Sequence, residues 1–146
     1  MALTETSSTW INLHFDLRFL EDKKHFVWAS ERDGYKHLYL YKVDGTLVRQ
    51  ITQGEWIVES IKSIDEENGL IYFSGRADTP LESHLYSAKL FEKSTPRRLT
   101  ETGKFHSVVM AKDNLTFIAR SSSVNQPAQV SLRDNLGNFI TWLEPN

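Results

Sequence analysis

The chain of 146 residues contains no cysteine, which excludes a disulfide framework and a thiolate metal site. It also lacks any apolar run of about 18 residues that could cross a membrane as a helix. Its net charge is −2 and its basic residues form no stripe, the densest spot being Arg97-Arg98. We therefore expect neither a membrane nor a nucleic acid as a partner.

The first nine residues lack the basic start and the apolar centre of a secretory signal. We interpret residues 1–9 as a linker or an artificial start. The location of the protein stays open, a periplasmic or secreted bacterial parent included.

No segment predicts a long helix, and the pattern that is present points to β-structure. Apolar, aromatic and β-branched residues recur three times at a spacing of about 45 residues, and each copy predicts four short strands. The expected strands of the three copies are 10–19, 25–30, 37–41 and 48–52; 56–64, 69–74, 84–88 and 96–100; and 105–111, 115–120, 129–133 and 139–144. This alignment places His25 over Gly69 and Leu115, and it places His37 over His84 and Gln129.

Turn residues separate the expected strands. Residues that tolerate positive φ are needed where the chain reverses, and such pairs lie between the apolar runs at Asp33-Gly34, Asp44-Gly45, Asn68-Gly69, Asp113-Asn114 and Asp134-Asn135. The period and the strand count predict an all-β fold, a partial β-propeller of three four-stranded antiparallel blades. The expected blades span residues 10–54, 55–103 and 104–146.

Three blades are too few to close a ring, because closed propellers have about 4 to 8 of them. The sequence also stops straight after an expected strand. We therefore interpret the chain as a fragment of a larger protein. Unpaired strand edges at its ends would favour association of the fragment with itself.

Several runs carry a family resemblance: residues 26–39, 51–56 and 122–127. They resemble the N-terminal β-propeller of bacterial dipeptidyl peptidase IV, a serine peptidase of the prolyl oligopeptidase type, and the resemblance extends from about Trp10 to Asn146. It implies an eight-bladed propeller followed by an α/β-hydrolase domain that releases dipeptides with proline or alanine in second position. The implied partners are that C-terminal hydrolase domain of the same parent chain and a peptide substrate.

Catalysis does not follow from the resemblance. No glycine starts the Gly-x-Ser-x-Gly turn that presents a hydrolase nucleophile, so we expect the chain alone to be no enzyme. The family recognises the substrate's amino terminus with paired glutamates, but Glu66-Glu67 lies between two expected strands and lacks the aromatic flank of that motif. We interpret this pair as a solvated turn.

The histidines and serines are candidate metal ligands, bases or nucleophiles. The five histidines contain no close ligand pair, and the equivalent positions of His37 and His84 favour a packing role that recurs with the blades. Residues 121–123 are three serines without an adjacent base, and we expect them in a polar loop. We predict no metal, no cofactor and no catalytic residue.

Two residues have a claim on substrate. By the resemblance, the segment Asp16-Leu17-Arg18-Phe19 falls near a region that contributes an aromatic side chain to the substrate cavity, so Arg18 and Phe19 are candidate substrate-lining residues. The alternative is that Phe19 packs inside the first blade. The four tryptophans are expected to fill the space between blades.

Two functional classes follow. The preferred one is a non-catalytic propeller segment that gates and orients peptides for the hydrolase domain of a dipeptidyl peptidase. The alternative is a binding or scaffold protein built from a TolB-like or WD-like propeller, without peptidase activity, because a fold does not determine a function.

Overall fold

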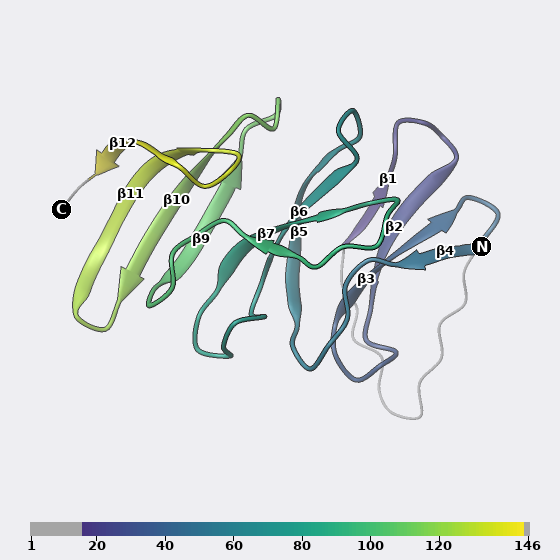
Figure 1. Ribbon diagram of the computed structural model, residues 1–146, viewed down its shortest axis with the longest axis horizontal. Coiled ribbons are helices and arrows are strands. Elements are labelled where there is room, and N and C mark those ends of the chain that lie inside the picture. The colour runs from purple at the N-terminus through teal and green to yellow at the C-terminus, as the bar shows by residue number, and fades with distance from the viewer. Residues whose placement is uncertain (1–15, 145–146) are drawn as a thin grey trace.

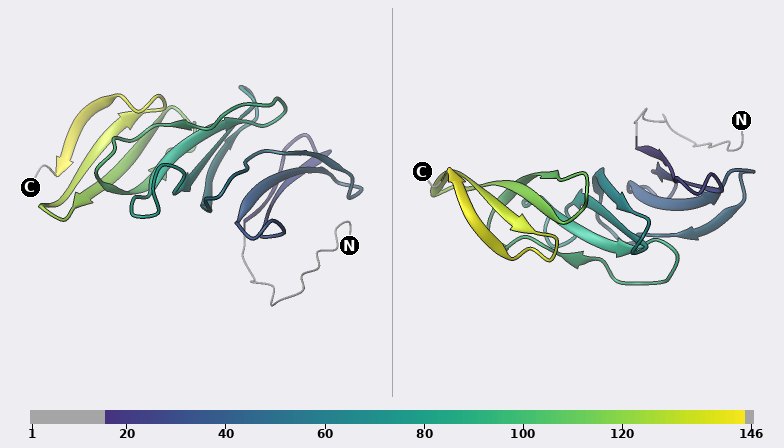
Figure 2. Two further views of the ribbon diagram at one scale, coloured as in Figure 1. Left: turned by 60° about the horizontal axis from the view of Figure 1, so that its bottom comes forward. Right: turned by 90° about the horizontal axis from the view of Figure 1, so that it is seen from above.

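The computed structural model describes residues 16–144, and this part of the chain consists of strands and loops. It contains no helix that is long and apolar enough to span a bilayer. The strands form three four-stranded antiparallel sheets in series, with the N-terminal and C-terminal sheets at opposite ends (Figure 1). Two further views show the same row of splayed sheets, as in consecutive blades of a propeller (Figure 2).

Each sheet is a meander of four consecutive strands. Sheet 1 contains β1 (Leu17–Phe19), β2 (His25–Ser30), β3 (His37–Lys42) and β4 (Leu47–Gln50). Sheet 2 contains β5 (Val58–Asp65), β6 (Leu70–Gly75), β7 (His84–Lys89) and β8 (Arg97–Arg98). Sheet 3 contains β9 (Phe105–Met110), β10 (Thr116–Ser123), β11 (Gln126–Asp134) and β12 (Phe139–Glu144).

The fold class predicted from the sequence is confirmed. Each described sheet falls within one expected blade, while the expected linker, Trp10 and the rest of the first expected strand up to residue 15 lie outside the described residues. The exact division into blades at 10–54, 55–103 and 104–146 stays a prediction.

One expected loop is a strand. Residues 121–123 belong to β10, where Ser121 pairs with His106 on one side and with Gln129 on the other, and Ser122 pairs with Phe105. The strand continues through the serines because Ser121 is paired on both sides, Ser122 with β9 and Ser123 with β11, across a register irregularity. The chain reverses at Val124 and Asn125 instead.

One expected turn uses a different residue. Asp134-Asn135 was expected to supply the positive φ before β12, but this conformation falls on Gly137, at φ 91°. The Asp134 carboxylate accepts the amide protons of Leu136 and Asn138, both at 2.9 Å, which lengthens the turn and moves the reversal along the chain.

The alignment of the first two copies was one residue out of register. In sheet 1, Trp28 pairs with Tyr39, and in sheet 2 it is Phe73 that pairs with Tyr86. His25 is therefore equivalent to Leu70 and not to Gly69. A slip of one residue sends every side chain of a strand to the opposite face, so the correction decides which residues meet between sheets.

We call the face that a sheet turns to the following sheet its forward face, and the opposite one its rear face. The forward face of sheet 1 packs on the rear face of sheet 2. Sheet 1 contributes Val27, Ala29, Leu38 and Leu40, and sheet 2 contributes Val58, Ile61, Ile71 and Phe73. The forward face of sheet 2 packs on the rear face of sheet 3 through Tyr72, Leu85 and Leu99 against Val108, Phe117 and Ala119. Burial of these side chains is the main stabilising contribution to the row of sheets.

Polar contacts join sheets 1 and 2. The buried Asp16 forms an ion pair with Lys36 at 2.5 Å and accepts the amide proton of Ile61 at 3.2 Å. The Glu66 carboxylate accepts the amide proton of Glu21 at 2.7 Å. Glu66 is therefore not a purely solvated turn residue, because it caps the β1–β2 turn of the neighbouring sheet.

Candidate functional site

A buried histidine begins the third strand of sheet 1. His37 Nε2 lies 2.8 Å from the carbonyl oxygen of Gly54, which can only accept, so this nitrogen carries the proton. Nδ1 is left to accept the Thr52 hydroxyl proton at 2.9 Å, while the same hydroxyl oxygen accepts the amide proton of Leu38 at 3.0 Å. Burial lowers the pKa of His37 and keeps the imidazole neutral.

Sheet 2 repeats this unit with one change. His84 Nδ1 lies 2.7 Å from the Thr100 hydroxyl, whose oxygen accepts the amide proton of Leu85 at 3.2 Å. Its Nε2 meets a carboxylate, Glu82, at 2.9 Å, and the same carboxylate oxygen accepts the amide proton of Gly103 at 3.0 Å. The predicted packing role of equivalent histidines agrees with this geometry.

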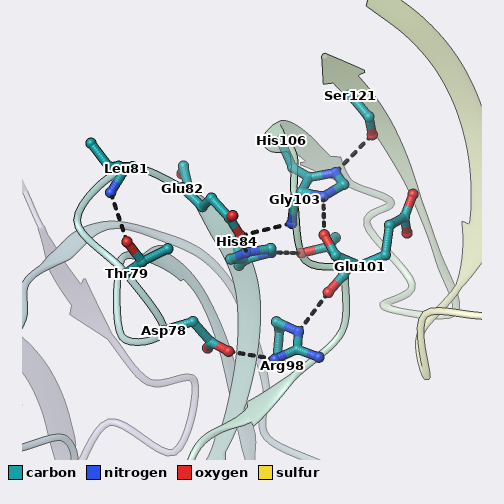
Figure 3. Close-up of polar contacts among 12 residues, drawn as sticks. Asp78, Thr79, Leu81, Glu82, His84, Arg98, Glu101, Gly103, His106 and Ser121 are labelled. Atoms are coloured by element: carbon teal, nitrogen blue, oxygen red, sulfur yellow. Dashed lines mark hydrogen bonds and ion pairs between the residues drawn. The ribbon is translucent and has the colours of Figure 1, made fainter. Parts of the chain in front are cut away.

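A third buried histidine joins sheet 3 to this cluster (Figure 3). His106 on β9 lies with its ring centroid 5.2 Å from that of His84. Its Nε2 donates to the Glu101 carbonyl at 2.8 Å, and its Nδ1 accepts the Ser121 hydroxyl proton at 2.7 Å. Burial lowers the pKa of His106, so the two sheets meet across a neutral imidazole.

The Glu101 side chain forms a second polar contact between these sheets. Arg133 on β11 donates to both of its carboxylate oxygens, at 2.6 and 2.9 Å. Lys104 Nζ lies 3.6 Å from Oε1 of the same carboxylate. Burial alone would raise the pKa of Glu101, but the hydrogen bonds from Arg133 and its charge outweigh burial and lower that pKa to about 2.

Next to His84 in sheet 2, with ring centroids 6.2 Å apart, Tyr86 forms a second repeated unit with a carboxylate. Tyr86 donates to Asp78 at 2.7 Å. Arg98 forms an ion pair with the same carboxylate (Figure 3) and donates to the Thr100 carbonyl at 2.8 Å. In sheet 1 the counterparts are Tyr39, Asp33 and Gln50, with Tyr39 donating to Asp33 at 3.0 Å and Gln50 at 3.2 Å from the same oxygen. Burial raises the pKa of both tyrosines, which remain protonated donors.

An open groove with a volume of about 910 Å³ lies between the outer strands of sheets 1 and 2. Its walls come from β4, from Tyr86 in the middle of β7, from β8 and from the loop at residues 93–96. Trp56 lines the groove, with its ring plane 13° from that of Phe73 and at 86° to that of His37. The tryptophan thus fills space between sheets, as expected for this residue.

The two candidate substrate residues lie on β1, at the edge of sheet 1. Phe19 is 68% exposed, with its ring 5.6 Å from that of Phe26 on the rear face, so it is not packed inside the blade. Arg18 points to the opposite face and donates to the Ile61 carbonyl at 3.4 Å. Neighbouring residues of a strand face opposite ways, so the structure does not bring these two side chains together, and neither lines the groove. Their contact with substrate stays a prediction.

Among residues 16–144, no three histidines, cysteines or carboxylates gather into a group that could hold a metal ion. The polar clusters above are composed of paired donors and acceptors. No sequence motif singled out Asp78, Arg98 or Arg49 as site residues. The equivalence of Tyr39 and Tyr86 carried a signal for Asp78, since each tyrosine follows an aspartate in its own copy.

Comparisons with known proteins agree on one family. Residues 1–128 match the family described as the dipeptidyl peptidase IV (DPP IV) N-terminal region. Mouse dipeptidyl peptidase 8 is 31% identical over 141 residues, covering 77% of this chain and 16% of that protein. Dipeptidyl peptidase 4 of Arthroderma otae is 29% identical over 124 residues, covering 82% of this chain and 16% of that protein.

A solved structure shows the same fold. The crystal structure of Porphyromonas gingivalis dipeptidyl peptidase 4 superposes with a TM-score of 0.87 at 24% identity, over 99% of this chain and 20% of that one. The chain thus spans 16% of the length of the curated relatives above, which come from a mammal and a fungus. The chain belongs to the dipeptidyl peptidase IV N-terminal region family and is a partial β-propeller of the kind associated with these peptidases.

Proposed function

We propose that this chain is a non-catalytic propeller segment of a dipeptidyl peptidase IV-like serine peptidase, and that it gates and orients peptide substrates for a separate α/β-hydrolase domain of the same parent chain. The observation that carries the proposal is the family match over residues 1–128, in a chain whose described part is a row of propeller-like sheets. The sequence has no nucleophile turn of its own, which supports a role apart from the chemistry.

Within this function, β1 is the strand of sheet 1 that contacts peptide. In a propeller the first strand of each blade lines the central channel, and β1 occupies that edge of its sheet. Phe19 is exposed there and offers an aromatic surface to an apolar side chain, while Arg18 adds a positive charge at the same edge. Such contacts would position a peptide without taking part in bond cleavage.

The test is hydrolysis of a chromogenic Gly-Pro substrate by this chain and by its parent polypeptide. We expect hydrolysis by the parent alone. Activity of the chain itself would contradict the non-catalytic role. A parent without activity but with a folded β-signal would favour the TolB-like or WD-like binding protein instead.

A variant of the parent tests the contact with substrate. Phe19→Ala should raise KM several-fold with little change in kcat, because it removes binding that is equal in the ground and transition states. Leu81→Ala is a matched control, since Leu81 is 85% exposed in a loop of sheet 2. Equal kinetics of the two variants would contradict the role of Phe19.

A further inference from the structure

The groove between the outer strands of sheets 1 and 2 contains more positive than negative charge. Among the described residues that line it are Arg49, Lys93 and Arg98, and Asp78 is the one carboxylate. That carboxylate is occupied, because it accepts hydrogen bonds from Tyr86 and Arg98. The other two cations therefore have no counter-charge among the described residues of the groove.

Arg49 is held in place from one side. Its Nη1 donates to the carbonyl oxygens of Lys89 and Leu90 at the end of β7, both at 3.0 Å, and these bonds connect the two sheets. No described carboxylate forms an ion pair with Arg49, and burial lowers the pKa of its guanidinium. Nε and Nη2 remain as donors on a cation that is partly removed from water and lacks an anionic partner.

Part of the lining of the groove is apolar. Trp56, which is fixed by its contacts with Phe73 and His37, lines the groove together with Ile51 and Pro96. These surfaces match the aliphatic stem of a side chain whose charged end reaches Arg49. A volume of about 910 Å³ lies near the upper end of the range of ligand sites, about 300–1,000 Å³, and is far larger than a single inorganic oxyanion requires.

We propose that this groove binds an acidic peptide segment. Carboxylates of the peptide accept hydrogen bonds from Arg49 and ion-pair with Lys93, and the stems of the side chains pack on Trp56 and Pro96. The site is separate from β1, where the proposed substrate contact lies, so a failure of one proposal leaves the other unaffected.

The test follows the indole N–H signal of Trp56 by NMR in the isotope-labelled chain. The chain has four tryptophans, and a Trp56→Phe variant identifies the signal that belongs to the groove. The probes are N-acetyl-tetraglutamate amide, its glutamine counterpart and inorganic phosphate, all at equal ionic strength. We expect saturable shifts of the Trp56 signal with the glutamate peptide alone, and weaker binding at higher salt.

Two charge variants locate the site. Arg49→Gln and Lys93→Gln should each weaken binding of the glutamate peptide, about tenfold for Arg49 because charge-assisted hydrogen bonds are lost. Lys93 is exposed and forms no hydrogen bond or ion pair with another described residue, so its variant tests the site with little change in packing. Arg97→Gln is the control, because Arg97 occupies the position in sheet 2 equivalent to Arg49 but points away from the groove.

Three results would overturn the proposal. Equal shifts with the glutamine peptide would show apolar binding without charge recognition. Shifts with phosphate that match those with the glutamate peptide would show a site for a small oxyanion. An equal loss of binding in Arg97→Gln and Arg49→Gln would show that net charge, and not this groove, attracts the peptide.

Discussion

Gly137 offers a sharp test of how sheet 3 sits on sheet 2. It lies in the turn between β11 and β12 at φ 91°, and a Cβ atom added there would lie 2.1 Å from the carbonyl oxygen of Leu99. Leu99 follows β8, and its amide donates to the Leu85 carbonyl at 2.8 Å. The variant Gly137→Ala must therefore move backbone at the contact between the two sheets.

The loss of unfolding free energy expected in Gly137→Ala has two contributions. A residue with a Cβ in a left-handed conformation costs about 1–2 kcal/mol. Relieving the overlap costs about another 1–2 kcal/mol, the equivalent of one or two backbone hydrogen bonds. Gly34 is a matched control, because its φ is 88° and an added Cβ would meet nothing within 4 Å. We expect Gly137→Ala to lower the free energy of unfolding by about 2–4 kcal/mol and Gly34→Ala by about 1–2 kcal/mol.

Urea denaturation followed by far-ultraviolet circular dichroism measures both variants. Each kcal/mol should also lower Tm by about 2–4 °C in a chain of this size. An equal loss of stability in the two variants would refute the close approach of this turn to Leu99, since backbone strain alone would then account for both.

Two further predictions concern the buried histidine units. Burial lowers the pKa of His37 and His106 below 6.5, so the unfolded state binds more protons in mild acid, and the free energy of unfolding should fall as the pH drops through about 6.5 and stay level above it. Urea midpoints measured across this range should show the fall, with a smaller one in His106→Gln, and a flat profile would contradict the assignment. Thr100→Val should cost about 1–3 kcal/mol because the amide of Leu85 loses its hydroxyl acceptor, whereas Thr95→Val, in an exposed loop, should be nearly neutral in the same assay.

Much of the fold could be predicted from local pattern. Runs of aromatic and aliphatic residues flanked by turn residues have their own signature, so strands such as β2, β3 and β7 agree with their predictions within one residue. The equivalence of His37 and His84 also predicted a recurring structural role. In the structure each histidine begins the third strand of its sheet and forms a hydrogen bond with a threonine that follows the fourth strand.

The functional candidates were harder to predict. Arg18 and Phe19 came from a resemblance, and the structure places them on opposite faces of β1. Arg49, Lys93 and Asp78 carry no local motif, and they line one groove only because sheets 1 and 2 splay apart at their outer strands.

The sequence by itself determined most of the secondary structure, the repeat and the family, since these depend on periodicity and on short motifs that are local along the chain. The tertiary structure decided the register between copies, the pairing of His84 with His106 and the groove with its uncompensated arginine. These features depend on which faces of consecutive sheets meet. A shift of one residue along a strand reverses those faces while leaving the composition of the segment almost unchanged.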